Sequence, residues 1–339
     1  MPKNRHIIGK GKIMSKKKVL GVGAAILDVL VNVEDSFIDG IDGEKGGMNL
    51  VSSDELDAMI EKTGKKTTLA PGGSAANTIF GLTKLNQPTA IFGMAGNDLD
   101  GEFYIEQYRN RGGDSSYIYK TDSAHTARCL SLVTPDSQRT MRTDLGAAAC
   151  LSSDFISDAM FAGISHVHFE GYTFFAGDLL ETSLKAAKIA GCTTSLDLAS
   201  FEVVNAVKDI LPTILEKYID IVFANEDEAK ALCDTEDADK QLEYLSKFCD
   251  VAVVKLGKDG AIIKKGNEIE TVDAEIVDAI DTTGAGDLWQ AGFLYGYLND
   301  KSLAETGAIA SMLGAAVVQV MGATIPEKAW EEIKERING

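Results

Sequence analysis

From Gly146 onward, the sequence alternates between short apolar segments and longer segments with helical spacing. Short β-branched runs predict strands at 164–169, 194–198, 219–224, 251–256 and 261–264. Apolar residues recur every three or four positions in the other segments, which predicts helices at 179–190, 201–211, 226–232, 239–247, 286–298 and 302–320. This alternation predicts an α/β fold in which helices cover both faces of a mostly parallel sheet. Ligands of such folds bind beyond the carboxyl ends of the strands.

The first part of the chain adds a different pattern. Residues 18–33 read as a strand broken by Gly21 and Gly23, and a glycine turn at 71–73 leads into a helix. Residues 126–134 and 139–144 alternate in polarity and are separated by a four-residue turn that begins at Pro135, which predicts a hairpin. Together with residues near 29–51, this hairpin predicts a small β appendage.

Composition excludes several classes of function. The net charge of −18 argues against a nucleic-acid partner, because binding to a phosphate backbone requires a basic surface. The apolar runs are too short or too interrupted to predict a membrane span. Five scattered cysteines without a C-x-x-C pair predict a reduced, cytoplasmic setting. The basic residues 1–17 are expected to form a flexible leader ahead of a single domain at 18–339.

The stretch Asp281-Thr282-Thr283-Gly284-Ala285-Gly286-Asp287 carries the strongest chemical signal. It precedes an apolar-periodic run, so Gly284, Ala285 and Gly286 are expected at a helix N-terminus. Unpaired N–H groups and the helix dipole attract anions there. A carboxylate beside a phosphate site suggests a base that takes a proton from an attacking hydroxyl, so Asp287 is the candidate catalytic residue. Taken alone, the same residues could form a glycine turn with an N-cap aspartate.

Four further motifs fall near predicted strand ends. Gly72 and Gly73 allow close approach of a ligand, and Asn77 adds a donor and an acceptor one turn later. Asp28, after the first apolar run, can accept bonds from substrate hydroxyls. The acidic segment that begins with Asn225 and includes Glu228 suits Mg²⁺ and its waters. In Lys255-Leu256-Gly257-Lys258-Asp259-Gly260, the two glycines can form a turn that runs along a polyphosphate, and Lys255 or Lys258 can neutralise its charge.

The order and spacing of these motifs resemble the PfkB or ribokinase family of carbohydrate and nucleoside kinases from about residue 18 to 328. The resemblance implies a ribokinase-like three-layer α/β/α core with a small β-sheet lid, formed from about 29–52 and 117–144. It also implies that Mg·ATP gives its γ-phosphoryl group to a primary hydroxyl. An NAD-dependent oxidoreductase is disfavoured because the glycine fingerprint that starts at Gly21 is incomplete at Ile26.

The resemblance also implies a role for each matching residue. Asp287 is the base, and Gly284 to Gly286 form an anion hole for the moving phosphoryl group. Asp28, Gly72, Gly73 and Asn77 grip the acceptor. Asn225 and Glu228 organise Mg²⁺ and phosphates, largely through water, while Gly257 and Gly260 lie along the nucleotide. Lys255 stands where ribokinases often carry Thr, so it either adds a phosphate contact or points to solvent. Asp281 and Thr283 match positions that hold a monovalent cation, such as K⁺, in some relatives.

The acceptor is less well defined. Segments 145–150, 220–226 and 322–328 look more like adenosine kinase than ribokinase, which favours adenosine or a similar nucleoside. Glu170 can bond a hydroxyl or a base nitrogen, although adenosine kinases tend to be apolar there. Arg128 and Arg142 suit an acidic or phosphorylated sugar, so a kinase for ribose, fructose or a keto-deoxy sugar acid is the alternative. A protein that binds such a ligand as a sensor without catalysis is a more distant alternative. The sequence is compatible with both a monomer and a homodimer.

Overall fold

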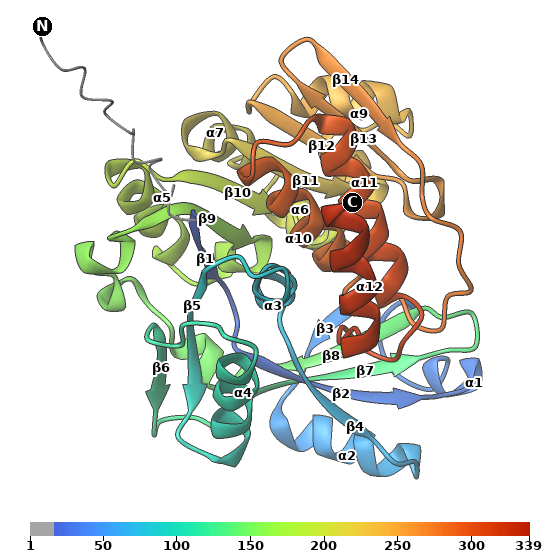
Figure 1. Ribbon diagram of the computed structural model, residues 1–339. Coiled ribbons are helices and arrows are strands. Elements are labelled where there is room, and N and C mark those ends of the chain that lie inside the picture. Colours follow the sequence, from blue (N-terminus) through green and yellow to red (C-terminus); the bar gives the residue numbers. More distant parts are fainter. Residues whose placement is uncertain (1–16) are drawn as a thin grey trace, which may run out of the picture.

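The computed structural model describes residues 17–339, so the expected leader lies almost wholly outside the described residues. A nine-stranded sheet with the order β14-β13-β12-β11-β10-β9-β1-β5-β6 forms its centre (Figure 1). The parallel strands are β1 (Lys18–Val22), β5 (Thr89–Gly96), β6 (Ile118–Thr121), β9 (Ile164–Glu170), β10 (Thr193–Asp197), β11 (Ile221–Asn225) and β12 (Val251–Lys255). Two antiparallel strands, β13 (Ala261–Lys265) and β14 (Glu268–Val272), complete one edge.

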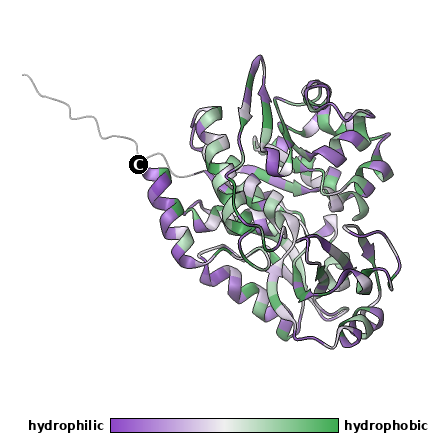
Figure 2. Cartoon of the chain, turned by 90° about the vertical axis from the view of Figure 1, so that its right-hand side faces the viewer, coloured by the Kyte–Doolittle hydropathy of each residue, from purple (hydrophilic) through white to green (hydrophobic). Residues whose placement is uncertain are grey.

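Helices cover both faces of this sheet because its inner strands are apolar on both sides. Phe223 of β11 packs with one cluster of buried residues and its neighbour Val222 packs with the other. The first layer contains α3 (Ser74–Lys84), α4 (Leu99–Asn110), α10 (Ala285–Leu298), α11 (Leu303–Val317) and α12 (Glu327–Asn338). The second contains α5 (Leu179–Ile189), α6 (Phe201–Val207), α7 (Leu211–Tyr218), α8 (Glu226–Cys233) and α9 (Ala238–Leu245). Figure 2 shows the resulting hydrophobic interior, with α12 largely hydrophilic on its outer side.

A second, five-stranded sheet lies beside the large one, in the order β3-β8-β7-β2-β4. Its strands are β2 (Ile26–Asn32), β3 (Met48–Leu50), β4 (Thr68–Gly72), β7 (Ala127–Val133) and β8 (Arg139–Asp144). One face packs beneath α1 (Asp35–Ile38) and α2 (Ser53–Thr63) through residues such as Val29 and Leu56. The opposite face carries Asp28 and Cys129, which are paired across β2 and β7. The predicted three-layer core with a small second sheet is therefore confirmed.

Several boundaries differ from the sequence-based expectation. Residues 18–33 form two strands that belong to different sheets, because the chain turns after Gly23, where a Cβ atom would lie 2.4 Å from Glu170 Oε2. The helix expected at 201–211 ends early, since α6 stops at Val207, and a separate helix, α7, begins at Leu211 with a proline in its first turn. The second sheet also takes in β4, whereas β6 joins the large sheet. Within residues 17–339, no helix is long and apolar enough to cross a membrane.

Candidate active site

Asp287 lies at the centre of the site, in the first turn of α10. Gly284 has φ +73°, a left-handed conformation that favours glycine, and this bend starts the helix. The helix has no side-chain cap, so its first N–H groups face the site without a side-chain acceptor. The side chain of Asp287 is buried beside them. The predicted combination of a carboxylate and an open helix N-terminus is therefore present in three dimensions.

Two side chains of α3 hold the Asp287 carboxylate. Asn77 Nδ2 donates to Oδ2 at 3.0 Å, and Ser74 Oγ lies 3.1 Å from Oδ1. Burial, followed by the nearby charge of Asp197, raises the pKa of Asp287 to about 6. At neutral pH this carboxylate is mostly ionised and still basic enough to accept a proton.

Ser74 also connects Asp287 to a second buried carboxylate. Its Oγ lies 3.2 Å from Asp197 Oδ2, at the carboxyl end of β10. Asp197 in turn forms an ion pair with Lys255, with 3.2 Å between Nζ and Oδ1. A serine hydroxyl has one hydrogen and can donate to only one of the two carboxylates at a time. Protonation of Asp287 completes this network, because Asp287 can then donate to Ser74 while Ser74 donates to Asp197.

The second sheet places another carboxylate and a cation opposite Asp287. Asp28 is buried in β2, and burial raises its pKa to about 7. A Cβ atom on Gly72 would lie 2.3 Å from Asp28 Oδ2, so only glycine permits this approach between β2 and β4. Arg139, at the start of β8, lies on the same face of the sheet as Asp28 and close enough to interact with the charges of Asp28 and Asp287. Burial opposes its charge, but Asp287 and Asp28 hold the pKa of Arg139 above its ordinary value.

Glu170, at the end of β9, is engaged by the protein itself. Its Oε1 accepts from Ala24 N and its Oε2 accepts from Ala75 N, both at 2.9 Å. These bonds tie the turn between β1 and β2 to the first turn of α3. Burial raises the pKa of Glu170 to about 7. The geometry shows Glu170 supporting the glycine turn at Gly73, and its expected contact with the acceptor stays a prediction.

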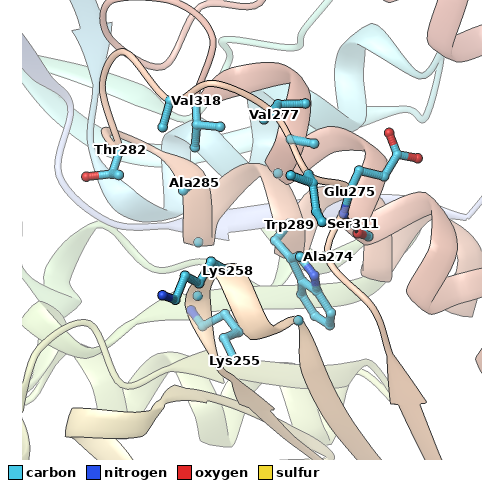
Figure 3. A pocket seen from close by; sticks show the side chains of 17 residues that line it. Lys255, Lys258, Ala274, Glu275, Val277, Thr282, Ala285, Trp289, Ser311 and Val318 are labelled. Carbon is cyan, nitrogen blue, oxygen red and sulfur yellow. Dashed lines mark hydrogen bonds between the residues drawn. The ribbon is translucent and has the colours of Figure 1, made fainter. Parts of the chain in front are cut away.

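A cavity of about 300 Å³ opens on the other side of α10 (Figure 3). Gly257 and Gly260 form its floor, and Gly286 and Trp289 of α10 contribute a wall. Lys255 lies between this cavity and Asp287, since a Cβ atom on Gly286 would be 3.0 Å from its Nζ. Lys255 therefore points into the site and not to solvent, which was the other orientation expected from the sequence.

Asn225 and Glu228, in the acidic segment at the end of β11, form hydrogen bonds that cap the N-terminus of α8. Asn225 Oδ1 accepts from Glu228 N, while the two Glu228 oxygens accept from Asn225 N and Nδ2, each at 2.8 Å. Burial raises the pKa of Glu228 to about 8. No cluster of three metal-binding side chains occurs in the described part of the chain. This donor set fits contact with Mg²⁺ through water only.

Asp281 ties its own segment, the candidate catalytic stretch 281–287, to the loop before α12. Its Oδ1 accepts from Thr283 N and Oγ1 at 2.8 and 2.7 Å, and its Oδ2 accepts from Gly322 N at 2.7 Å. These three protein donors explain why a fully buried carboxylate is tolerated here. The turn between β7 and β8 also reaches this stretch, because Ser137 O accepts from Thr282 Oγ1 at 3.1 Å.

Other expected residues lie away from the site. Arg128 bonds Asp57 and Ser53 on the α2 side of the second sheet, and Arg142 donates to the carbonyls of Asp42 and Met141. Arg128 and Arg142 therefore serve as structural groups.

Three side chains of the site were missed at the sequence level: Ser74, Asp197 and Arg139. Ser74 stands inside the glycine motif, and Asp197 ends a correctly predicted strand, so position gave a usable signal for both. Arg139 could be found only by following the alternation of β8, because Thr143, Met141 and Arg139 share the face that carries Asp28 and Cys129.

Comparison with known proteins supports the family resemblance independently of the site geometry. A model of the "pfkB family carbohydrate kinase" matches residues 48–330. A ribokinase from Staphylococcus aureus is 26% identical over 272 residues, which are 78% of this chain and 87% of the relative. The crystal structure of adenosine kinase from Sinorhizobium meliloti has a TM-score of 0.89 and 32% identity. A probable sugar kinase from Rhizobium etli has a TM-score of 0.89 and 31% identity. Each of these two structures covers 95% of this chain, which covers 99% of each of theirs.

Proposed function

Because the chain belongs to the pfkB family of carbohydrate kinases, which phosphorylate hydroxyl groups with ATP and Mg²⁺, we propose that it phosphorylates a primary hydroxyl of a nucleoside, with adenosine as the leading acceptor. The observation that carries the proposal is Asp287, a buried base at an open helix N-terminus between two ligand-binding spaces. Similarity over nearly the full chain to an adenosine kinase supports the acceptor.

In this proposal, Asp287 takes the proton of the acceptor hydroxyl. At the same time, the oxygen of that hydroxyl forms a bond to the γ-phosphorus of ATP. The bond from that phosphorus to the bridging oxygen breaks, and ADP leaves. Asn77 holds the Asp287 carboxylate in position. Once Asp287 is protonated, its carboxyl group donates a hydrogen bond to Ser74. The backbone of Gly284, Ala285 and Gly286 faces the charge on the moving phosphoryl group.

The second sheet, formed by β2, β3, β4, β7 and β8, is proposed to act as a lid over the acceptor. Asp28 accepts bonds from acceptor hydroxyls, beside the backbone of Gly72 and Gly73. The contact of Ser137 with Thr282 supports closure, because it joins the lid turn to the catalytic stretch. A closed lid excludes water and so protects the phosphoryl group from hydrolysis.

On the nucleotide side, Lys255 is proposed to contact the phosphates, with Gly257 and Gly260 along the nucleotide. Bound Mg²⁺ would neutralise phosphate charge, and Asn225 and Glu228 would contact its water shell. A monovalent cation at Asp281 and Thr283 stays a prediction, as does the choice between a monomer and a homodimer.

A sugar kinase is the second candidate, and one observation favours it. Arg139 is a cation without a hydrogen-bonded carboxylate among the described residues, and it faces the acceptor space. Such a group suits an acidic sugar better than a neutral nucleoside. Similarity to a probable sugar kinase supports this alternative equally.

Acceptor-dependent ADP formation with a panel of nucleosides, neutral sugars and sugar acids tests both candidates. Adenosine is expected to give the highest kcat/KM, and preference for a sugar acid would reverse the order. Asp287→Asn is expected to lower kcat by roughly 10²- to 10⁴-fold while ATP still binds. Asp209→Asn, at an exposed position, is the matched control. Absence of acceptor-dependent turnover with every compound would favour the sensor.

A further inference from the structure

A second cavity, of about 280 Å³, lies between α3, α4, the start of α10 and the segment that leads into α12. All four elements belong to the same helical layer (Figure 1). None of its lining residues takes part in the cavity at Lys255. Phe80, Leu288 and Trp330 provide an apolar wall. The proposed phosphoryl transfer makes no use of this space.

Two cations line the cavity, and one of them has no carboxylate partner. The guanidinium of Arg111, just after α4, lies 4.8 Å from the centre of the Phe80 ring. Within residues 17–339, no carboxylate forms a hydrogen bond with it, and its Nη1 atom is buried without any hydrogen-bond partner. Burial lowers the pKa of Arg111, and the nearby Tyr104 and Glu327 oppose this shift only in part. Burying a guanidinium without a hydrogen-bonded carboxylate is costly, and an anion in the cavity would reduce that cost.

The second cation, Lys84, is already paired with Glu327 at the start of α12. The cavity therefore carries one surplus positive charge. Gln107, Asn110 and Thr324 also line it, and their side chains make no hydrogen bond to any described residue. These polar groups can bind a ligand without first breaking contacts within the protein.

We propose that this cavity binds a small organic carboxylate with an apolar body. A single carboxylate matches the single surplus charge, and the planar guanidinium of Arg111 can bind it through two parallel hydrogen bonds. The apolar body would pack against Phe80, Leu288 and Trp330. A phosphate dianion fits less well, because it carries one charge too many and leaves the apolar wall uncovered.

The cavity wall also touches the catalytic stretch. Ala323 lines the cavity, and a Cβ atom on Gly284 would lie 2.5 Å from Ala323 Cβ. Leu288, on the same wall, directly follows Asp287. A bound carboxylate therefore acts on the loop that supports the open end of α10, and we expect it to change kcat.

A single-tryptophan protein tests binding directly. The chain has two tryptophans, and Trp289→Phe leaves Trp330 in the cavity wall as the reporter. Titration with benzoate at constant ionic strength is expected to change Trp330 fluorescence in a saturable way. Benzamide, which has the same shape without the charge, is expected to bind about tenfold more weakly or worse, since the charge-assisted bond is lost.

Variants locate the site. Arg111→Gln and Lys84→Met, each checked for folding by circular dichroism, are expected to weaken benzoate binding about tenfold or more. Arg109→Gln removes the same charge from an exposed position on α4 and is expected to leave binding unchanged. Equal binding of benzamide, tighter binding of inorganic phosphate, or unchanged affinity in both cavity variants would overturn the proposal.

The effect on catalysis rests on the proposed function and is measured separately. Saturating benzoate is expected to change kcat of the wild type but not of Arg111→Gln. A kcat that does not respond would refute the coupling through Ala323. Absence of kinase activity with every acceptor would refute the proposed function, and the fluorescence titration would still decide whether the cavity binds a carboxylate.

Discussion

Replacing Asp28 by asparagine is expected to stabilise the folded protein at alkaline pH. Burial, with smaller contributions from the charges of Asp287 and Asp281, raises the Asp28 pKa from 3.8 to about 7, although the positive charge of Arg139 opposes this shift. Ionisation of this side chain in the folded state therefore costs about 4 kcal/mol, since the shift is roughly 3 pH units at about 1.4 kcal/mol each. Asparagine keeps the shape of the side chain and carries no charge.

The sign of the effect follows from the raised pKa. Below the unfolded-state pKa, Asp28 is neutral in both states and ionisation has no effect on stability. As the pH rises through the folded-state value of about 7, the unfolded state gains the advantage of free ionisation and the folded wild type loses stability. The variant lacks this loss, so its advantage grows from near pH 4 to near pH 8.

Urea unfolding of the wild type and Asp28→Asn at several pH values measures this difference. The free energy of unfolding of the variant is expected to exceed that of the wild type by up to about 4 kcal/mol near pH 8. The exposed Asp209→Asn controls for the general loss of negative charge. Parallel pH dependences for wild type and Asp28→Asn would refute a buried, strained carboxyl at this position. Acceptor affinity is expected to fall in the same variant, because Asp28 loses a charge-assisted bond.

Three further outcomes are expected in kinetic assays. If Asp287 is the base, kcat/KM falls about tenfold per pH unit below its pKa of about 6, and a rate that is flat down to pH 5 would contradict this role. Lys255→Met is expected to raise the KM for ATP roughly thirtyfold, as loss of a charged contact costs about 2 kcal/mol; the exposed Lys66→Met, outside the cavity, is the control, and equal effects in both would argue against a specific contact. Arg139→Gln is expected to shift the pH–rate profile to higher pH, because Asp287 and Asp28 lose a nearby positive charge; an unmoved profile would place Arg139 outside the site.

The pattern of apolar residues predicted most of the architecture, because the burial of a strand or of one helix face determines that pattern locally. Apolar periodicity marked β9 to β13 and the helices between them, since burial on both faces requires apolar strands. The break between β1 and β2 was harder to place, because a glycine in an apolar run signals a bend but not the sheet to which each half belongs. The amphipathic α12, with its polar outer side, was likewise not recognised.

The catalytic stretch shows the same division. Gly284, Gly286 and Asp287 could be assigned from sequence because a helix N-terminus is a local structure whose chemistry follows from its backbone. The identity of the neighbours of Asp287 could not, since Ser74, Asp197 and Lys255 lie far apart in the chain and meet only where α3, β10 and β12 converge.

By itself, the sequence determined the fold class, the position of the helix N-terminus at Gly284 to Gly286, and the carboxylate placed beside it. Tertiary structure alone decided that Lys255 points inward, that Glu170 is held by Ala24 and Ala75, and that Arg139 rather than Arg128 or Arg142 lies near Asp28 and Asp287. The physical reason is that periodicity specifies which face of an element is buried. Burial, charge and pKa depend on which other elements cover that face, and only the folded chain brings those together.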